Sequence, residues 1–323
     1  MFKHTGYCLR KTLAVAVAAV LCQCAGLAEQ VQAVDIAVLT SDNLTSTQRT
    51  LSGAKTVIAG AHPETRFTVF FLDKDPEHHA AAVDSIRNLN PSLILTVGSS
   101  ATELAQKNFT GIPIVFSSVK YPELSGFVES ARRPGRNITG ASLDIPVDIQ
   151  FKYFRRIIPE LKRLGVLYTK NTESLIPGAK AIARQMGLEL VAVHVQSDRD
   201  LPEALDSLIE SVEAIWSVAD ANLFKPTSTR YILLNTVRKG IPFMGFSRYV
   251  VESGALCALD FDYKAVGFQA GAIVNRVIAG ERPGDIRVTT ADVIWFHYNE
   301  NTAKRIHISI PQELASIAKE VYR

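Results

Sequence analysis

The sequence is poor in cysteine, and its few cysteines are unevenly placed. Three of the four lie within the first 24 residues, which leaves Cys257 alone in the rest of the chain. A single cysteine cannot form an intramolecular disulfide, so the fold beyond residue 33 must depend on its own hydrophobic core. Hydrophobic residues make up 47% of the 323 residues, and a chain of this length can bury most of them.

The sequence also lacks a strong excess of charge of either sign. It contains 35 Lys and Arg against 32 Asp and Glu, a formal net charge of +3. Proteins that bind nucleic acid usually carry a basic footprint, so this balance predicts no nucleic-acid partner. Short basic pairs such as Arg132-Arg133 are interpreted as solvated surface, with docking to a partner as the alternative.

Several catalytic and cofactor motifs are absent. The chain has no GxxxxGK phosphate loop and no GxGxxG after a predicted strand. Residues 245–249 begin like a nucleophile elbow, but Tyr249 stands where that turn requires glycine. His78 and His79 are sequence neighbours and cannot share a helix face, so they do not predict a zinc site. We therefore predict that the protein is not an enzyme and has no cofactor and no metal.

One long apolar run is present, close to the start of the chain. Basic residues precede the apolar segment 13–22, and small residues around Ala33 provide a cleavage site. This pattern is typical of a secretory signal peptide, which we place at residues 1–33, and it predicts a soluble periplasmic protein. The run is short for a transmembrane span. A lipoprotein anchor at Cys22 or Cys24 is the alternative, although neither cysteine follows a small residue.

Beyond the leader, short apolar runs alternate with amphipathic stretches. The spacing predicts strands over 35–39, 67–72, 93–97, 114–116, 137–143, 163–168, 188–194, 214–218, 241–246, 255–259 and 292–298. Helices are predicted between most of these strands, with Asp262 as the cap of one helix, and a last helix is expected over 311–322. The alternation restarts after Pro146. It therefore predicts an α/β protein with two parallel, doubly wound sheets.

Small polar residues follow six of the predicted strands. These residues are Thr40, Ser41, Ser99, Ser100, Ser117, Ser118, Asn171, Asp220, Asn222 and Ser247. Open α/β sheets bind ligands at the carboxyl ends of their strands, and helix N-termini there can hold a carboxylate. Helix capping explains any single turn as well. Taken together, the six turns favour a ligand-binding cleft between two lobes. Tyr121, Phe246 and Tyr249 are candidates to stack on the ligand, with burial in the core as the alternative.

Several longer motifs resemble one family. They are Ile112-Pro-Ile-Val-Phe116, Arg133-Pro-Gly-Arg-Asn137-Ile-Thr-Gly140, Pro159-Glu-Leu-Lys-Arg163, and Gly254-Ala-Leu-Cys-Ala-Leu259 followed by Asp262-Tyr263. From about Asp35 to Glu313 the chain resembles the tryptophan/tyrosine-like substrate-binding proteins of ABC importers. In one place it departs from them, because Lys120-Tyr121-Pro122 stands where many relatives have Asp-Pro. That departure puts an aromatic amino acid in doubt as the ligand.

The resemblance implies a two-lobed, type I periplasmic-binding fold with a hinge of crossover strands. Lobe 1 is expected to comprise residues 34–145 plus about 258–283, and lobe 2 residues 146–257 plus about 284–323. The resemblance also implies an ABC permease and an ATPase as partners. We expect a monomer that binds a small anionic or zwitterionic, amino-acid-like ligand between the lobes. A sensor subunit that presents its ligand-bound form to a signalling receptor is the alternative.

Overall fold

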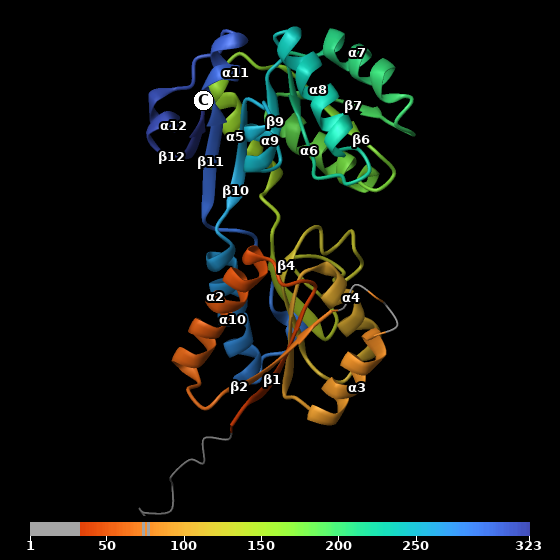
Figure 1. Cartoon of the computed structure of the whole chain (residues 1–323), viewed down its shortest axis with the longest axis vertical. Helices are drawn as coiled ribbons and strands as arrows, with labels where there is room; N and C mark the ends of the chain where they lie inside the picture. The colour runs from red at the N-terminus through yellow and green to blue at the C-terminus, as the bar shows by residue number, and fades with distance from the viewer. Residues whose placement is uncertain (1–32, 73–74, 76–77) are drawn as a thin grey trace, which may run out of the picture.

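The chain forms two lobes joined by a narrow connection (Figure 1). The computed structural model describes residues 33–72, 75 and 78–323, so nearly all of the predicted signal peptide lies outside the described residues. Each lobe is built on one sheet. Strand order is β2-β1-β3-β4-β5 in the first and β12-β11-β10-β9-β8-β6-β7 in the second. The prediction of an α/β fold with two lobes is confirmed.

The first sheet is entirely parallel. Its strands are β1 (Asp35–Thr40), β2 (Arg66–Phe71), β3 (Leu93–Val97), β4 (Ile114–Val119) and β5 (Ile138–Ser142). Its helices are α2 (Thr45–Ala61), α3 (His79–Leu89), α4 (Ser99–Asn108) and α10 (Tyr263–Ile278). Apolar side chains from α2 and α10 pack on one face of the sheet, and those from α3 and α4 pack on the other. This is the layered arrangement that the alternating pattern predicts.

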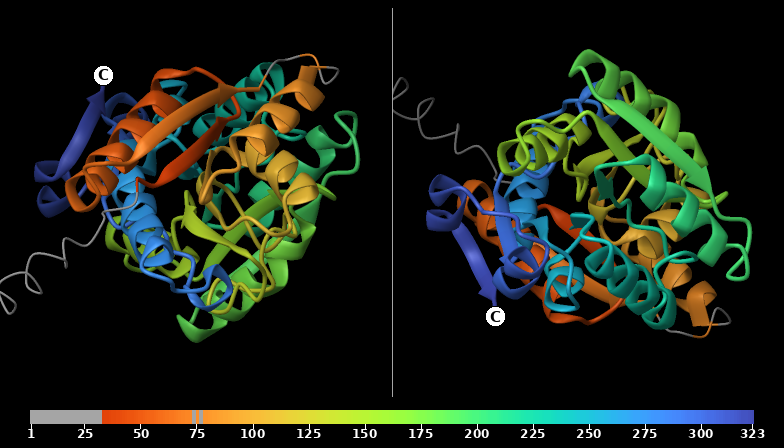
Figure 2. Two further views of the ribbon diagram at one scale, coloured as in Figure 1. Left: turned by 90° about the horizontal axis from the view of Figure 1, so that it is seen from below. Right: turned by 90° about the horizontal axis from the view of Figure 1, so that it is seen from above.

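The pairing of α2 with α10 brings distant parts of the chain together, as Figure 2 shows from below. The two helices approach closely because glycines face the contact. A Cβ atom added to Gly267 would lie 2.1 Å from the carbonyl oxygen of Thr50, and one added to Gly271 would lie 2.8 Å from that of Ala54. The glycines of α10 therefore allow this helix to close the core of the first lobe.

The second sheet is mixed. Its strands are β6 (Arg163–Tyr168), β7 (Glu189–His194), β8 (Ala214–Trp216), β9 (Phe243–Gly245), β10 (Cys257–Phe261), β11 (Ile294–Asn299) and β12 (Ala318–Tyr322). Its helices are α5 (Val147–Ile157), α6 (Ile176–Gln185), α7 (Leu201–Ser211), α8 (Pro226–Arg238), α9 (Arg248–Glu252), α11 (Glu300–Arg305) and α12 (Gln312–Ser316). The pair β10 and β11 is antiparallel, whereas a parallel sheet was predicted. Among the described helices, none is long and apolar enough to cross a lipid bilayer.

Two predicted elements are wrong in type or extent. The helix expected over 311–322 ends at Ser316, and the chain continues as β12, which pairs with β11. Pairing with an edge strand supplies the backbone hydrogen bonds that a longer helix would have made. β4 extends to Val119, so Ser117 and Ser118 lie inside a strand rather than in the turn after it.

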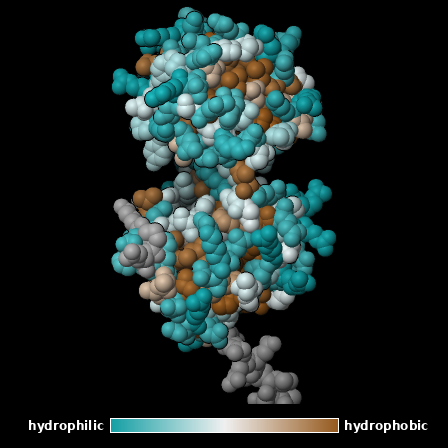
Figure 3. Space-filling view, turned by 90° about the vertical axis from the view of Figure 1, so that its right-hand side faces the viewer, coloured by the Kyte–Doolittle hydropathy of each residue, from teal (hydrophilic) through white to brown (hydrophobic). Residues whose placement is uncertain are grey.

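The strand pairings also show which residues belong to each sheet, and at two points this differs from the segments expected for the lobes. β10 pairs with β9 and β11, so residues 258–261 belong to the second sheet, whereas they were expected in lobe 1. Thr289 bridges to Ala141 of β5, which keeps residues up to 289 beside the first sheet. The chain thus passes between the sheets at three places: after β5, between β10 and α10, and before β11. The space-filling view shows the constriction between the lobes at these connections (Figure 3).

Candidate functional site

A cavity of about 340 Å³ lies where the two lobes meet. Lys120 and Tyr121 reach it from the end of β4, and residues 143–147 form the side next to the connection. The second lobe contributes the N-terminal part of α6, the end of β8 and Phe246 after β9. These strands end at facing edges of the two sheets, which is where open α/β sheets bind ligands.

The wall formed by the second lobe is largely apolar. Trp216, Leu259 and Phe261 line it, and Trp216 is 2% exposed. The indole of Trp216 packs edge-on against Phe151, with ring centroids 5.1 Å apart. Its Nε1 donates a hydrogen bond to Oε1 of Gln150 at 2.8 Å. Packing and this hydrogen bond together hold the ring in one orientation, and a rigid aromatic surface of this kind suits the apolar part of a ligand.

The wall formed by the first lobe is polar. The backbone N–H of Tyr121 donates to both carboxylate oxygens of Asp144, at 3.0 and 3.1 Å. Burial raises the pKa of Asp144, and these hydrogen bonds and Lys120 oppose that rise. Burial, followed by the charge of Asp144, raises the pKa of the Tyr121 phenol to about 12, while hydrogen bonding to the backbone of Ala219 opposes it. Tyr121 therefore stays protonated at neutral pH and reaches toward the second lobe.

A second cavity, of about 660 Å³, lies beside the first. Lys120, Phe246 and Phe261 line both cavities. Adjacent residues of a strand point to opposite faces, so on β10 Leu259 lines the first cavity and Asp260 the second. The two cavities therefore lie on opposite sides of β10. The strand predicted over 255–259 stopped short of Asp260, but Asp260 is part of β10.

Four of the predicted ligand-binding residues line these cavities. Tyr121 and Phe246 line the first. Phe246, Ser247 and Tyr249 line the second. Phe246 packs on Phe224, with ring centroids 5.1 Å apart, which orients its ring from the side of the second lobe. The pair Tyr121 and Phe246 thus comes from the two lobes, as expected of residues that contact one ligand.

The serines at the N-terminus of α4 have a different arrangement. The side chain of Ser41 accepts a hydrogen bond from the backbone N–H of Ala101 at 2.9 Å, so it satisfies the first turn of that helix. Ser99 and Ser100 are exposed in the same turn. Neither lines the two cavities described above.

Three further residues that were predicted to bind the ligand lie in strands of the first sheet. Thr40 and Ser117 are fully buried, and each has a hydroxyl oxygen with no partner among the described residues. Ser118 adopts a positive φ of 56°, and its hydroxyl lies 3.0 Å from that of Thr50 on α2. None of these three side chains lines the two cavities. Thr40 ends β1, and Ser117 and Ser118 lie within β4.

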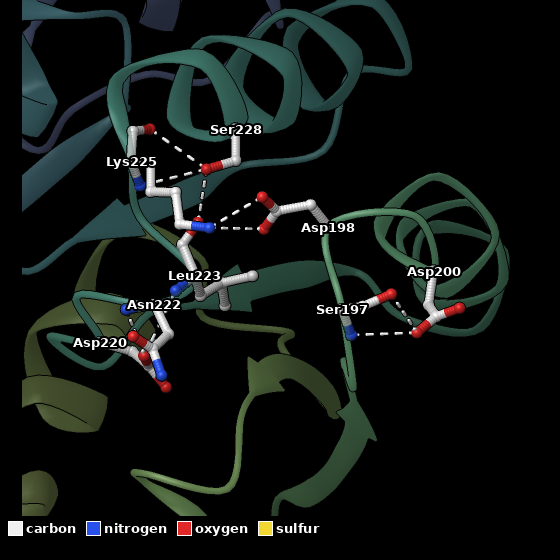
Figure 4. A network of polar contacts seen from close by, with 8 residues as sticks. All are labelled: Ser197, Asp198, Asp200, Asp220, Asn222, Leu223, Lys225 and Ser228. Carbon is white, nitrogen blue, oxygen red and sulfur yellow. Dashed lines mark hydrogen bonds and ion pairs between the residues drawn. The ribbon is translucent and has the colours of Figure 1, made fainter.

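Asp220 organises the turn after β8 (Figure 4). One carboxylate oxygen accepts from the N–H and hydroxyl of Thr169 and from the hydroxyl of Thr172, at 3.2, 2.7 and 2.7 Å. The other accepts from the N–H groups of Asn222 and Leu223, at 3.0 and 3.3 Å. Asp220 is 3% exposed, and both of its carboxylate oxygens already accept hydrogen bonds from the protein. These contacts support the interpretation that Asp220 caps the turn. The neighbouring Asn171 and Asn222 are exposed to solvent.

Several residues of the first cavity were not proposed from the sequence, among them its main polar and aromatic side chains. Lys120 had been noted only as a departure from a motif, and Asp144, Gln150 and Trp216 had not been proposed as site residues. Asp144 and Gln150 flank Pro146, and this proline at the restart of the pattern was the available signal. Among the described residues, no group of three or more His, Cys, Asp or Glu side chains is placed to hold a metal ion.

Two lobes, three connections and a cavity between facing sheet edges define a two-lobed ligand-binding protein. The model of the family "ABC transporter substrate binding protein" matches residues 66–322, and the chain belongs to this family. The resemblance inferred from the motifs is thereby confirmed.

Two curated proteins illustrate the similarity in sequence. A "Tyrosine-binding protein" of Clostridioides difficile (strain R20291) is 27% identical over 218 residues, which are 66% of this chain and 62% of that protein. The chain thus matches less than two thirds of that relative. An uncharacterized protein of Rickettsia prowazekii (strain Madrid E) is 20% identical over 218 residues, 66% of each chain.

Solved structures show the same fold. A ligand-free, open substrate binding protein with adhesive properties from Clostridium difficile has a TM-score of 0.75 at 19% identity, covering 90% of this chain and all of that one. An ABC domain in complex with L-Trp from Streptococcus pneumonia has a TM-score of 0.65 at 20% identity, with the same coverage. At these identities the likeness establishes the two-lobed fold and nothing finer.

Proposed function

We propose that the protein is the periplasmic substrate-binding component of an ABC importer. It binds a small anionic or zwitterionic, amino-acid-like ligand and delivers it unaltered to a permease and an ATPase. The observation that carries this proposal is the cavity between the lobes, which combines the apolar wall around Trp216 with the ammonium of Lys120 and the carboxylate of Asp144. Membership of the family supports the binding role.

The dimensions of the cavity support a ligand of amino-acid size. Ligand sites usually measure about 300 to 1,000 Å³ and are largely apolar, with a few polar groups that orient the ligand. The cavity of about 340 Å³ falls at the small end of that range. Relatives described as tyrosine-binding and as a complex with L-Trp support the same class of ligand.

We further propose that the lobes close on the ligand by bending at the three connections. In this scheme lobe 1 comprises residues 34–145 and about 262–290, and lobe 2 contains the remainder up to residue 323. Closure brings Tyr121 and the exposed Ser99 and Ser100 toward Phe246 and Ser247 of the second lobe. The importer role also requires export, so the N-terminus of the protein recovered from the periplasm should lie near Val34.

A thermal-shift screen tests the ligand class. Amino acids, small carboxylates, sugars and nucleosides are each added to the purified protein, and the melting temperature is measured. A ligand present at 100 times its Kd should stabilise the folded protein by about 2.7 kcal/mol. We expect carboxylate-bearing compounds to raise the melting temperature. If a neutral sugar or nucleoside raises it and no carboxylate does, the proposed ligand class is wrong.

A further inference from the structure

The ammonium group of Lys120 occupies a central place between the lobes. Lys120 follows β4 of the first sheet and lines the cavities on both sides of β10. Its Nζ lies 5.9 Å from the centroid of the Phe246 ring, which belongs to the second lobe. A cation over an aromatic face gains some electrostatic stabilisation, but the ring accepts no conventional hydrogen bond.

Lys120 has no hydrogen bond or ion pair with any described residue, although an ammonium carries three donors. The two carboxylates whose charges act on this ammonium already have partners. Asp144 accepts twice from the N–H of Tyr121. Asp260 accepts from the N–H groups of Arg248 and Phe261, at 3.4 and 2.9 Å. Burial lowers the pKa of the Lys120 ammonium, and the charges of Asp260 and Asp144 oppose that shift.

A partly buried ammonium without hydrogen-bond acceptors is costly in the ligand-free protein. A ligand carboxylate in either cavity would supply the missing acceptors at the point where the cavities meet. The apolar wall around Trp216 is then left for the body of the ligand. A ligand that carries only an amine would instead place a second positive charge next to this ammonium.

We propose that Lys120 receives the carboxylate of the ligand and thereby selects carboxylates over amines of the same shape. This inference rests on the proposed function, because it concerns the same cleft, and it names the residue that determines the ligand's charge.

Titration calorimetry with two matched ligand sets tests the inference. One set is L-tyrosine, tyramine, which lacks the carboxylate, and 3-(4-hydroxyphenyl)propionate, which lacks the amine. The other is L-tryptophan, tryptamine and indole-3-propionate. The proteins are the wild type, Lys120→Met, Lys120→Arg, and Lys107→Met as a matched control. Lys107 lies on the surface of α4, and Glu103 is its only ion-pair partner among the described residues, so its loss should leave binding unchanged.

In the wild type, the carboxylates of at least one set should bind about 30-fold or more tightly than the amine. Lys120→Met should remove most of this advantage by weakening the carboxylates, and Lys120→Arg should retain part of it. A purely structural lysine would behave differently, because its loss would lower the melting temperature of the ligand-free protein. We expect that melting temperature to stay equal or rise in Lys120→Met.

The two proposals fail in distinguishable ways. Equal affinity of wild type and Lys120→Met for a carboxylate overturns the role of Lys120 and leaves the proposed function standing. Tight binding of tyramine or tryptamine by the wild type also overturns the role of Lys120, because neither compound carries a carboxylate. If the wild type binds no member of either set, and the thermal-shift screen finds only a neutral ligand, both proposals are overturned together.

Discussion

The N–H of Tyr121 and the carboxylate of Asp144 join two of the chain segments that lead out of the first sheet. Tyr121 follows β4 with a positive φ of 50°, and Asp144 follows β5 at the first connection between the lobes. Tyrosine rarely adopts this conformation, so the two hydrogen bonds to Asp144 stabilise an unfavourable backbone. The pair therefore couples the cavity wall to the connection about which the lobes would move.

Asp144→Asn should preserve this contact and remove the cost of burying a charge. The amide oxygen still accepts from Tyr121, and the pKa of Asp144 in the folded protein is raised by burial. A raised carboxyl pKa means that the wild type loses stability as pH increases from the ordinary carboxyl pKa of 3.8 through the higher pKa of the folded protein. The melting temperature of the variant relative to wild type should therefore increase between pH 3 and pH 7, as measured by circular dichroism. A constant or decreasing difference would contradict the prediction.

Asp220→Asn should show the opposite dependence. Burial raises the pKa of Asp220, but the hydrogen bonds from Thr172, Thr169, Leu223 and Asn222 outweigh it and the net pKa is lowered. This carboxylate therefore stabilises the fold above the ordinary carboxyl pKa of 3.8, and the stability is lost as pH falls through the lower pKa of the folded protein.

The variant replaces an acceptor with an NH₂ group facing donors, so it should lose about 2 kcal/mol or more at pH 7. Urea unfolding at pH 7 and near pH 3 measures this deficit, which should shrink at the lower pH. A deficit of equal size at both values would show that the charge of Asp220 is not what stabilises the turn.

Gly267→Ala tests the close contact between α10 and α2. The added methyl group would overlap the carbonyl oxygen of Thr50, so the helices must separate or shift. Overpacking of this kind typically costs about 1 to 3 kcal/mol. Gly60→Ala is the matched control, because it adds the same methyl group to α2 where no atom lies within 4 Å. The control should be stabilised by up to about 1 kcal/mol. Chemical unfolding of both variants tests the contrast, and similar effects would refute it.

Asp262→Ala tests the predicted cap of α10. The side chain accepts a hydrogen bond from the N–H of Lys264 at 2.8 Å, so the capping prediction is confirmed. Removal of such a cap should cost about 1 kcal/mol. Asp262→Asn keeps the acceptor and should cost little. Arg49→Met controls for the exposed ion pair between Arg49 and Asp262, and we expect a change below about 1 kcal/mol. If Arg49→Met costs as much as Asp262→Ala, the ion pair is the main contribution.

Local patterns were enough to predict the fold class and most of its elements. β3 and β6 begin and end where the sequence predicted, because apolar periodicity is a local signal. Two of the cleft aromatics, Tyr121 and Phe246, were also named from the sequence as candidates to stack on a ligand. In each of these cases the information lies within a few neighbouring residues.

Other features depended on contacts between residues far apart in the chain. β12 is a strand because β11 offers it an edge, and β10 belongs to the second sheet because β9 and β11 flank it. Asp220 is held by Thr169 and Thr172, which are 51 and 48 residues away. The sequence by itself determined which residues prefer strands, helices and turns. Only the tertiary structure decided which carboxylates accept hydrogen bonds from the protein and that the ammonium of Lys120 faces the cavity without such a partner among the described residues. The physical reason is that these contacts form between distant residues, which meet only when each lobe folds.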